Sequence, residues 1–332
     1  MTVDSFTHIN PKAYMGLLLN TGDPQVREVV SEYAGICSKD PNFCDPEERK
    51  RDMERYGIDV QVVTVQPTLD PNYFSLPFEL KRRLSTSLND ELAWIQGRSG
   101  GRIAAAASVA ISTEGIVDEE EMERAVKELG LRGFLALTHI DCTPIDRLES
   151  FWRKAHSLGA PVFLHPIDPC KRTAGPYEAE YYAVHVLSWP HETAVTLYRL
   201  VSAGVLGKYT GAKVIAHHLG GGIPFLWGRI WESLDRGSTP TRGVSLPSRD
   251  SVMEGLLRVS YDTAIGGNKA SVRCALEVLG PKRLIFATDY PWGPRAGRHR
   301  LESYPRMIGE LGLDEEDEED IMDLNARRIL RL

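Results

Sequence analysis

Short apolar segments alternate along the chain with longer segments in which apolar residues recur at helical spacing. The apolar segments are largely continuous rather than strictly alternating with polar residues, as in VQVVTV, PVFLH and KVIAH. This pattern is typical of parallel strands that are buried on both faces. We therefore predict strands over residues 2–8, 59–66, 102–111, 132–138, 161–165, 213–217, 257–262 and 283–289.

Amphipathic helices are predicted between these strands. Several of them end at a glycine just before the next strand, at Gly57, Gly130, Gly159 and Gly280. Glycine is favoured there because it adopts the left-handed conformation that closes a helix. We expect helices over residues 47–56, 117–129, 144–158, 192–204 and 268–279.

The number of strands predicts an α/β fold of the (β/α)8 TIM-barrel type. A doubly wound open sheet is the alternative, but it usually has fewer strands and a glycine-rich first turn, and no G-x-G-x-x-G follows the first strand. No Pro/Ser/Gly-rich linker divides the chain, so we expect a single domain over residues 1–332. Long loop insertions are expected after strands two and five, at 67–80 and 166–190, where loops of this length are usually functional. The acidic run 314–320 is expected to begin the last helix.

The composition narrows the class of protein. The 332 residues include 39 basic and 46 acidic side chains, and the resulting net charge of −7 argues against nucleic acid or an anionic membrane as a partner. The 5 cysteines are widely spaced without a C-x-x-C pair, so neither a disulfide framework nor a thiolate zinc site is predicted. The N-terminus lacks the pattern of a signal peptide, and no segment is apolar enough for a membrane helix. We expect a cytoplasmic protein.

Polar side chains gather at the carboxyl ends of the predicted strands, where the active site of a barrel lies. His8, His165 and Asp289 form a candidate metal site there, because imidazole and carboxylate groups suit Zn, Mn or Fe. Taken singly, each could be a buried histidine, a strand end or a helix cap. Three such groups in one barrel mouth would be costly without a shared partner. The other polar residues at strand ends are Gln66, Thr138, His139, His217, His218 and Asp262.

The sixth predicted strand runs into the segment IAHHLGGGIP. Glycines 220–222 could open a helix N-terminus that suits an anion, or form only a tight turn. His218, which the predicted metal site does not use, can act as a general acid or base near neutral pH. Asp262 could orient a ligand histidine or cap the next helix.

Several stretches together resemble the amidohydrolase superfamily, in the branch typified by 2-amino-3-carboxymuconate-6-semialdehyde decarboxylase and the hydroxybenzoate decarboxylases. The similar stretches occur in the order of the family across nearly the whole chain. They are DSFTHINP, DPEERKRDMERYGIDVQVVTVQP, ELGLRGFLAL, FWRKAHSLGAPVFLHP, SAGVLGKYTGAKVIAHHLGGGIPFLWGRI, RLIFATDYPWG and NARRIL.

The resemblance implies roles for particular residues. His165 and Asp289 match metal ligands, and the H-x-G-x-G-x-P spacing that ends at Pro224 selects His218 rather than His217 as the catalytic histidine. Arg229 matches an arginine that can reach the site of a neighbouring subunit and hold a substrate carboxylate, which implies a homodimer. Arg49 or Arg51 matches a second carboxylate-binding arginine. A solvated helix face is the alternative for these last two.

The first strand departs from the family pattern. Relatives usually begin with H-x-H or E-x-H, two ligands that point the same way from one strand. Phe6 occupies the first of these positions and cannot bind a metal, so only His8 remains. Three ligands are still enough for an open metal site.

We therefore predict a metal-dependent decarboxylase, a carbon–carbon lyase acting on a small aromatic or enoic carboxylic acid. It would use one divalent metal ion, with zinc favoured and manganese as the alternative. His218 and Asp289 would be catalytic, and aromatic side chains would wall a flat substrate. A metal-dependent hydrolase of an amide, lactone or ester is the alternative, and a metal-free binding protein with a decayed site is a second. The candidate wall residues are Tyr73, Phe74, Trp189 and Trp292.

Overall fold

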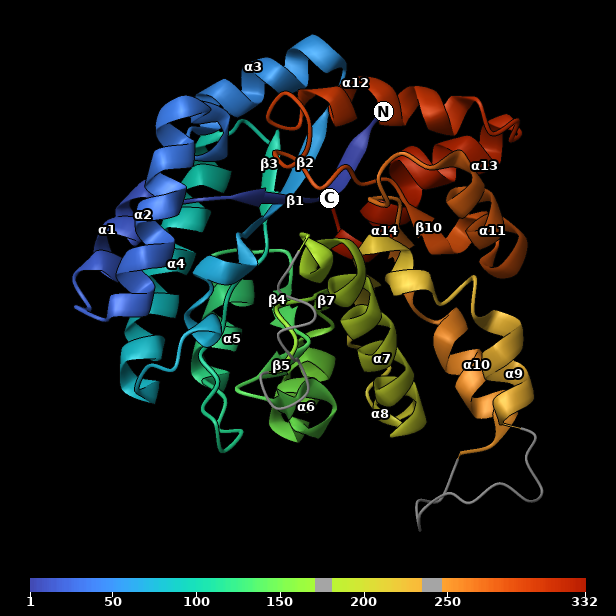
Figure 1. Cartoon of the computed structure of the whole chain (residues 1–332), viewed down its shortest axis with the longest axis horizontal. Coiled ribbons are helices and arrows are strands. Elements are labelled where there is room, and N and C mark those ends of the chain that lie inside the picture. The colour runs from blue at the N-terminus through green and yellow to red at the C-terminus, as the bar shows by residue number, and fades with distance from the viewer. Residues whose placement is uncertain (171–180, 235–246) are drawn as a thin grey trace.

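The computed structural model of the chain describes residues 1–170, 181–234 and 247–332. Its parallel strands lie at the centre and helices surround them (Figure 1). Each of the eight predicted strands is present, although several are shorter than expected. They are β1 (Val3–Ile9), β2 (Val60–Val65), β3 (Ile103–Ala105), β4 (Phe134–Leu137), β7 (Pro161–His165), β8 (Lys213–Ala216), β9 (Ser260–Asp262) and β10 (Leu284–Ile285).

The strands follow one another in the order of a barrel. They form a three-stranded sheet, β1-β2-β3, and a five-stranded sheet, β10-β9-β8-β7-β4. Backbone contacts link the two sheets at both junctions. The Arg132 amide donates to the Ala105 carbonyl at 2.7 Å, and the Ser5 amide donates to the Phe286 carbonyl at 2.9 Å. This arrangement confirms the predicted (β/α)8 architecture. A short antiparallel hairpin, β5 (His139–Ile140) with β6 (Thr143–Pro144), follows β4.

The helices lie outside the strands. Every helix predicted above is present with bounds shifted by a few residues, and Gly57 and Gly159 take the left-handed conformation at the ends of α3 and α6. Asp314 caps α13 by accepting from the Asp317 amide, so the acidic run begins a helix as predicted. The helices are α1 (Lys12–Leu19), α2 (Pro24–Lys39), α3 (Pro46–Tyr56), α4 (Phe78–Arg98), α5 (Glu119–Lys127), α6 (Glu149–Leu158), α7 (Trp189–Ser202), α8 (Val205–Lys208), α9 (Trp227–Ser233), α10 (Arg249–Leu257), α11 (Lys269–Leu279), α12 (Arg298–Gly309), α13 (Glu315–Glu319) and α14 (Asn325–Leu330). No helix in the described ranges combines the length and apolar character needed to span a membrane.

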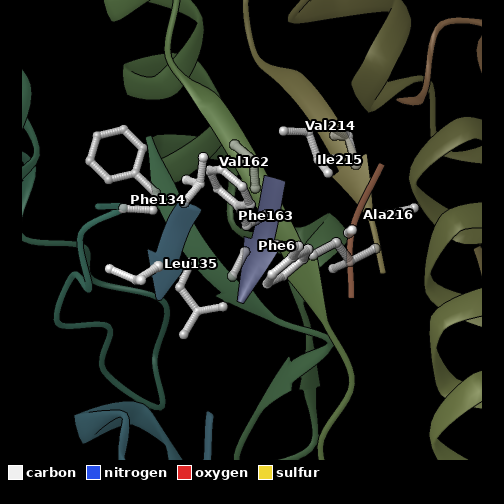
Figure 2. Close-up of a cluster of buried hydrophobic side chains, with 14 of the residues drawn as sticks. Phe6, Phe134, Leu135, Val162, Phe163, Val214, Ile215 and Ala216 are labelled. Atoms are coloured by element: carbon white, nitrogen blue, oxygen red, sulfur yellow. The ribbon is translucent and has the colours of Figure 1, made fainter. Parts of the chain in front are cut away.

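The interior of the barrel is a packed core. All seven residues of β1 are buried, and Phe6 on this strand lies among residues of β7 and β8 (Figure 2). The Phe6 ring meets the Phe163 ring edge-on at 5.1 Å between centroids. Phe6 therefore closes the floor of the barrel mouth with apolar surface.

The two predicted insertions meet over this mouth. After β2 the chain forms two single turns, Pro67–Leu69 and Pro71–Tyr73, before α4 begins. After β7, Asp168 accepts from the Tyr73 hydroxyl at 2.9 Å and from the indole nitrogen of Trp189 at 3.2 Å. Part of the second insertion, residues 171–180, lies outside the described residues.

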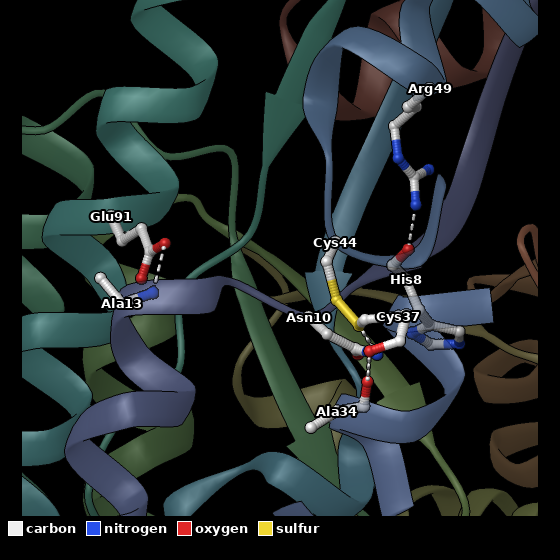
Figure 3. The surroundings of a disulfide bond; sticks show 9 residues. His8, Asn10, Ala13, Ala34, Cys37, Cys44, Arg49 and Glu91 are labelled. Carbon is white, nitrogen blue, oxygen red and sulfur yellow. Dashed lines mark hydrogen bonds between the residues drawn. A yellow bond between two sulfur atoms is a disulfide. The ribbon is translucent and has the colours of Figure 1, made fainter. Parts of the chain in front are cut away.

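The cysteine prediction was wrong. Cys37 and Cys44 form a disulfide between the end of α2 and the segment before α3 (Figure 3), and Cys142 and Cys170 form another between the β5–β6 hairpin and the segment after β7. The Cα atoms are 5.7 Å and 5.1 Å apart, within the range that a disulfide spans. The fold brings these cysteines together, and their wide spacing in the sequence gave no sign of it. Cys274 is free.

Candidate metal and active site

Four histidines and one aspartate converge at the carboxyl ends of four strands. His8 lies on β1 and His165 on β7, while His217 and His218 follow β8 and Asp289 follows β10. The ligand atoms of His8, His165 and His217 lie within 4.8 Å of one another, and those of His217, His218 and Asp289 do so too. The Asp289 Oδ1 lies 3.2 Å from the His8 Nε2 and 3.5 Å from the His217 Nε2. The structure thus brings together five of the residues that the sequence placed at strand ends.

Hydrogen bonds fix how the imidazoles face this centre. The His165 Nδ1 donates to the Pro166 carbonyl at 2.5 Å, and the His217 Nδ1 donates to the Asp262 carboxylate. The His8 Nδ1 lies 2.8 Å from the Thr64 hydroxyl. Among the described residues, the Nε2 atoms of His8 and His217 are buried without a hydrogen-bond partner. Such orphaned nitrogens next to a carboxylate fit a cation, because imidazole lone pairs and carboxylate oxygens are its usual ligands.

Electrostatics favour neutral imidazole at three of these four positions. Burial lowers the pKa of His8, and burial together with the neighbouring His217 holds the pKa of His165 and that of His218 well below their usual value. Burial alone would also lower the pKa of His217, but the carboxylates of Asp262 and Asp289 outweigh it and raise this pKa to about 9. A cation bound at this point would replace the proton that His217 otherwise holds between two carboxylates.

Asp289 is kept ionised although it is buried. Burial opposes its charge, but the Arg300 guanidinium and the nearby histidines outweigh burial and hold the pKa of Asp289 well below its usual range. Arg300 donates to the Asp289 Oδ2 at 2.6 Å and to the Thr288 carbonyl at 3.1 Å. One carboxylate oxygen is therefore held by Arg300, while the other faces the histidines.

Asp262 orients the histidine next to it. One of its oxygens accepts from the His217 Nδ1, and the other accepts from the backbone amides of His218 and Ala264, both at 3.0 Å. Helix α11 is capped instead by Asn268. Of the two interpretations left open by the sequence, the structure supports orientation of a histidine.

The segment after β8 is a tight turn. His218, Leu219, Gly220 and Gly221 all have positive φ, and α9 begins only at Trp227. A Cβ at Gly221 would lie 1.8 Å from the Pro190 carbonyl oxygen of α7, so the turn packs too closely for any side chain. The glycines therefore form the turn rather than open a helix. This turn places the His218 ring 5.8 Å from the His165 ring between centroids. The Nδ1 of His218 is buried without a hydrogen-bond partner in the described chain.

The three predicted carboxylate-binding arginines have different surroundings. Arg49 is fully buried, and its guanidinium donates to the Gln61 side chain at 2.8 Å, to the Thr7 hydroxyl and to the His8 carbonyl (Figure 3). Arg51 is exposed on α3 and pairs with Glu48. Arg229 is exposed on α9. The contact between Arg49 and His8 is to the backbone carbonyl rather than to the imidazole, so a role of these arginines in binding substrate stays a prediction.

The predicted aromatic walls differ in how near they lie to the histidines. The Trp189 ring lies 5.8 Å from the His165 ring between centroids. The Trp292 indole donates to Gln66 at 2.8 Å and packs edge-on against Phe43. Phe74 is buried and its ring meets the Tyr73 ring edge-on, with 5.3 Å between centroids.

Comparison with known proteins identifies the family. The amidohydrolase family model matches residues 3–332, almost the whole chain. The chain belongs to the amidohydrolase family. Its sequence is 26% identical over 262 residues to a 2-amino-3-carboxymuconate-6-semialdehyde decarboxylase of Dictyostelium discoideum, covering 76% of this chain and 68% of that protein.

Solved structures of two decarboxylases share the fold. The 5-carboxyvanillate decarboxylase of Sphingomonas paucimobilis superposes with a TM-score of 0.85 at 20% identity, covering 100% of this chain and 99% of that one. A dihydroxybenzoic acid decarboxylase of Polaromonas sp. JS666, solved with manganese and 2-nitroresorcinol, gives a TM-score of 0.80 at 22% identity, covering 100% and 97%. The predicted family and fold are thereby confirmed.

Two residues of the site, His217 and Arg300, were not assigned to it from the sequence. His217 was set aside because the H-x-G-x-G-x-P spacing points to His218. Arg300 lies on α12, which begins after Asp289 in the chain. Nothing in the sequence around Arg300 marks it as a partner of the Asp289 carboxylate. For His217 a signal was available, since it lies directly at a predicted strand end.

Proposed function

We propose that this amidohydrolase is a metal-dependent decarboxylase of a small aromatic carboxylic acid. The observation that carries the proposal is the convergence of four histidines and Asp289, with imidazole nitrogens that are buried and have no hydrogen-bond partner in the described parts of the chain. The named relatives act on muconate-type and hydroxybenzoate-type acids, which supports decarboxylation over hydrolysis. A bound divalent cation supplies Lewis-acid polarisation of a substrate oxygen.

The protein side chains would divide the remaining work. His8, His165 and Asp289 would hold the cation, with Arg300 keeping Asp289 ionised. His218 would move a proton at the ring carbon that loses CO2, since its Nδ1 is buried without a partner among the described residues. Trp189 beside His165 would exclude water from one side of a flat substrate.

Finer parts of the proposal concern the metal and the assembly. The imidazole-rich ligand set suits zinc, whereas a structural relative contains manganese, so both ions belong in the test. Arg229 is exposed on α9 near the exposed side chains of Phe225 and Trp231. A homodimer formed through this face would bring Arg229 to the site of the partner subunit, where it would hold the substrate carboxylate. We place the enzyme in the cytoplasm, with no nucleic-acid or membrane partner.

The test is CO2 release from a panel of hydroxylated benzoic acids by protein loaded with Zn²⁺ or Mn²⁺. We expect turnover by the wild type, a loss of about 10²–10⁴-fold in His218→Ala with metal retained, and loss of both metal and turnover in His165→Ala. His299→Ala, an exposed histidine on α12, is the matched control and should behave as the wild type. Hydrolysis of esters or lactones without any CO2 release would instead make the protein a hydrolase.

A further inference from the structure

Phe6 and His217 face each other inside the barrel. Their rings are 4.1 Å apart between centroids, and both side chains are fully buried. Phe6 lies two residues before His8 on β1, so both side chains point to the same side of the strand. A ligand at position 6 would therefore share a cation with His8. The phenyl ring has no atom that can bind a metal. It packs beside β8 (Figure 2) and against the His217 ring.

His217 has the properties of a ligand that is aimed at this centre. Its Nδ1 is held by Asp262, and Asp262 is itself fixed by two backbone amides, so the ring has one orientation. The Nε2 on the other side is buried and unpartnered among the described residues. A carboxylate that holds one nitrogen while the other binds metal is the usual support of a metal-binding histidine.

The distances place this nitrogen with the other ligands. A ring nitrogen of His217 lies within 4.8 Å of the ligand atoms of His8 and His165, and its Nε2 lies 3.5 Å from the Asp289 Oδ1. Ligands that are each about 2.0–2.2 Å from one zinc ion lie roughly 3–4 Å apart. Small side-chain movements would bring all four groups to a common ion.

We propose that His217 is a metal ligand of this amidohydrolase and supplies from β8 the coordination that Phe6 cannot supply from β1. The ion would then be held by His8, His165, His217 and Asp289, which leaves the neighbouring His218 free for proton transfer. The inference rests on the proposed function only in requiring that the site binds a divalent cation. It assigns the two adjacent histidines of the HHLGGG segment to different tasks.

The test measures metal affinity rather than turnover. Metal-free protein is titrated with Zn²⁺ and Mn²⁺ against a chromophoric chelator, and the Co²⁺-loaded form is followed by visible absorption. We expect His217→Ala to weaken binding by about 10-fold or more and to change the Co²⁺ spectrum. His218→Ala is the matched control, because it removes the adjacent imidazole, and it should keep the affinity and the Co²⁺ spectrum of the wild type.

Two further variants guard against a folding defect. Asp262→Asn keeps the shape of the side chain but weakens the support of His217, so we expect a loss of affinity of about 10–100-fold. Phe6→His in the His217→Ala background should restore affinity if the two positions serve the same ion. Restoration cannot come from a general effect on stability.

The outcomes separate this inference from the proposed function. If His165→Ala loses the metal while His217→Ala binds it as tightly as the wild type, His217 is not a ligand and the metal site itself stands. If His218→Ala rather than His217→Ala weakens binding, the assignment of the two histidines is reversed. A wild-type protein that binds none of the three ions overturns both the inference and the metal-dependent function.

Discussion

Arg49 matches the sequence position of a carboxylate-binding arginine, but its side chain is buried and contacts other parts of this protein. Its guanidinium lies inside the protein between β1 and β2, where it donates to the His8 carbonyl, to Thr7 and to Gln61. These acceptors are neutral, and burial lowers the pKa of Arg49. The contact with the backbone of His8 connects this arginine to the metal site through the strand. We infer that Arg49 is a positioning residue.

The prediction is that Arg49 variants lose stability. Arg49→Met should lower the free energy of unfolding by about 1–3 kcal/mol, because it leaves buried acceptors on β1 and β2 without a donor. Arg51→Met, on the exposed side of the same helix, should leave the free energy of unfolding close to that of the wild type. Urea unfolding of both variants measures the difference. A raised KM in Arg49→Lys with unchanged stability would instead favour the substrate-binding role.

At the residue scale, the sequence indicates which side chains lie at the barrel mouth wherever strand position decides this, while their role as metal ligands stays a prediction. His8, His165 and Asp289 were predicted together because carboxyl ends of barrel strands meet at one mouth. Which way a side chain turns is set by its partners, and these come from distant parts of the chain. The hydrogen bonds from Arg300 to Asp289 and from His217 to Asp262 are examples. No sequence motif with a defined spacing links the two residues of either pair.

At the scale of elements, buried strands were the easiest to predict. Their apolar runs leave no polar face, so every one of the eight was found, although β10 has only 2 residues in the regular ladder. Helices α2 and α4 were not singled out. In α2 the buried residues Val26, Val30 and Tyr33 have helical spacing, but polar residues between them dilute the pattern. Disulfides between elements depend on the tertiary fold and could not be predicted from cysteine spacing.

The turn between β8 and α9 carries a prediction of its own. Gly221 has a φ of 64°, and a Cβ there would collide with the Pro190 carbonyl of α7. Gly221→Ala should therefore destabilise the protein by about 2 kcal/mol or more and displace His218. Gly228→Ala on α9 is the control, since the described residues leave space around its Cβ and alanine favours a helix by roughly 0.5–1 kcal/mol. Equal thermal stability of the two variants would contradict a close packing of this turn.

At the scale of the whole molecule, the site joins segments that are far apart in the sequence. His8 lies on the first strand and Asp289 follows the last, and the backbone of β1 bonds to this segment where the Asp289 amide donates to the Phe6 carbonyl at 3.2 Å. The two chain ends also lie near each other (Figure 1). An ion shared by His8, His165 and Asp289 would therefore tie the first, fifth and eighth barrel strands together at one end. The native state alone offers this arrangement of ligands, because the unfolded chain separates them.

Metal removal should therefore lower the stability of the whole barrel. A ligand that binds only the native state at about 100 times its Kd adds about 2.7 kcal/mol, which corresponds to a rise in Tm on the order of 5 °C for a chain of this size. We expect chelator-treated protein to melt that much lower than metal-loaded protein, and added Zn²⁺ or Mn²⁺ to restore the Tm. His165→Ala should show a much smaller shift with the same ions, since it lacks a ligand from the central strand. A wild-type Tm that does not respond to saturating metal would mean that no ion connects these strands.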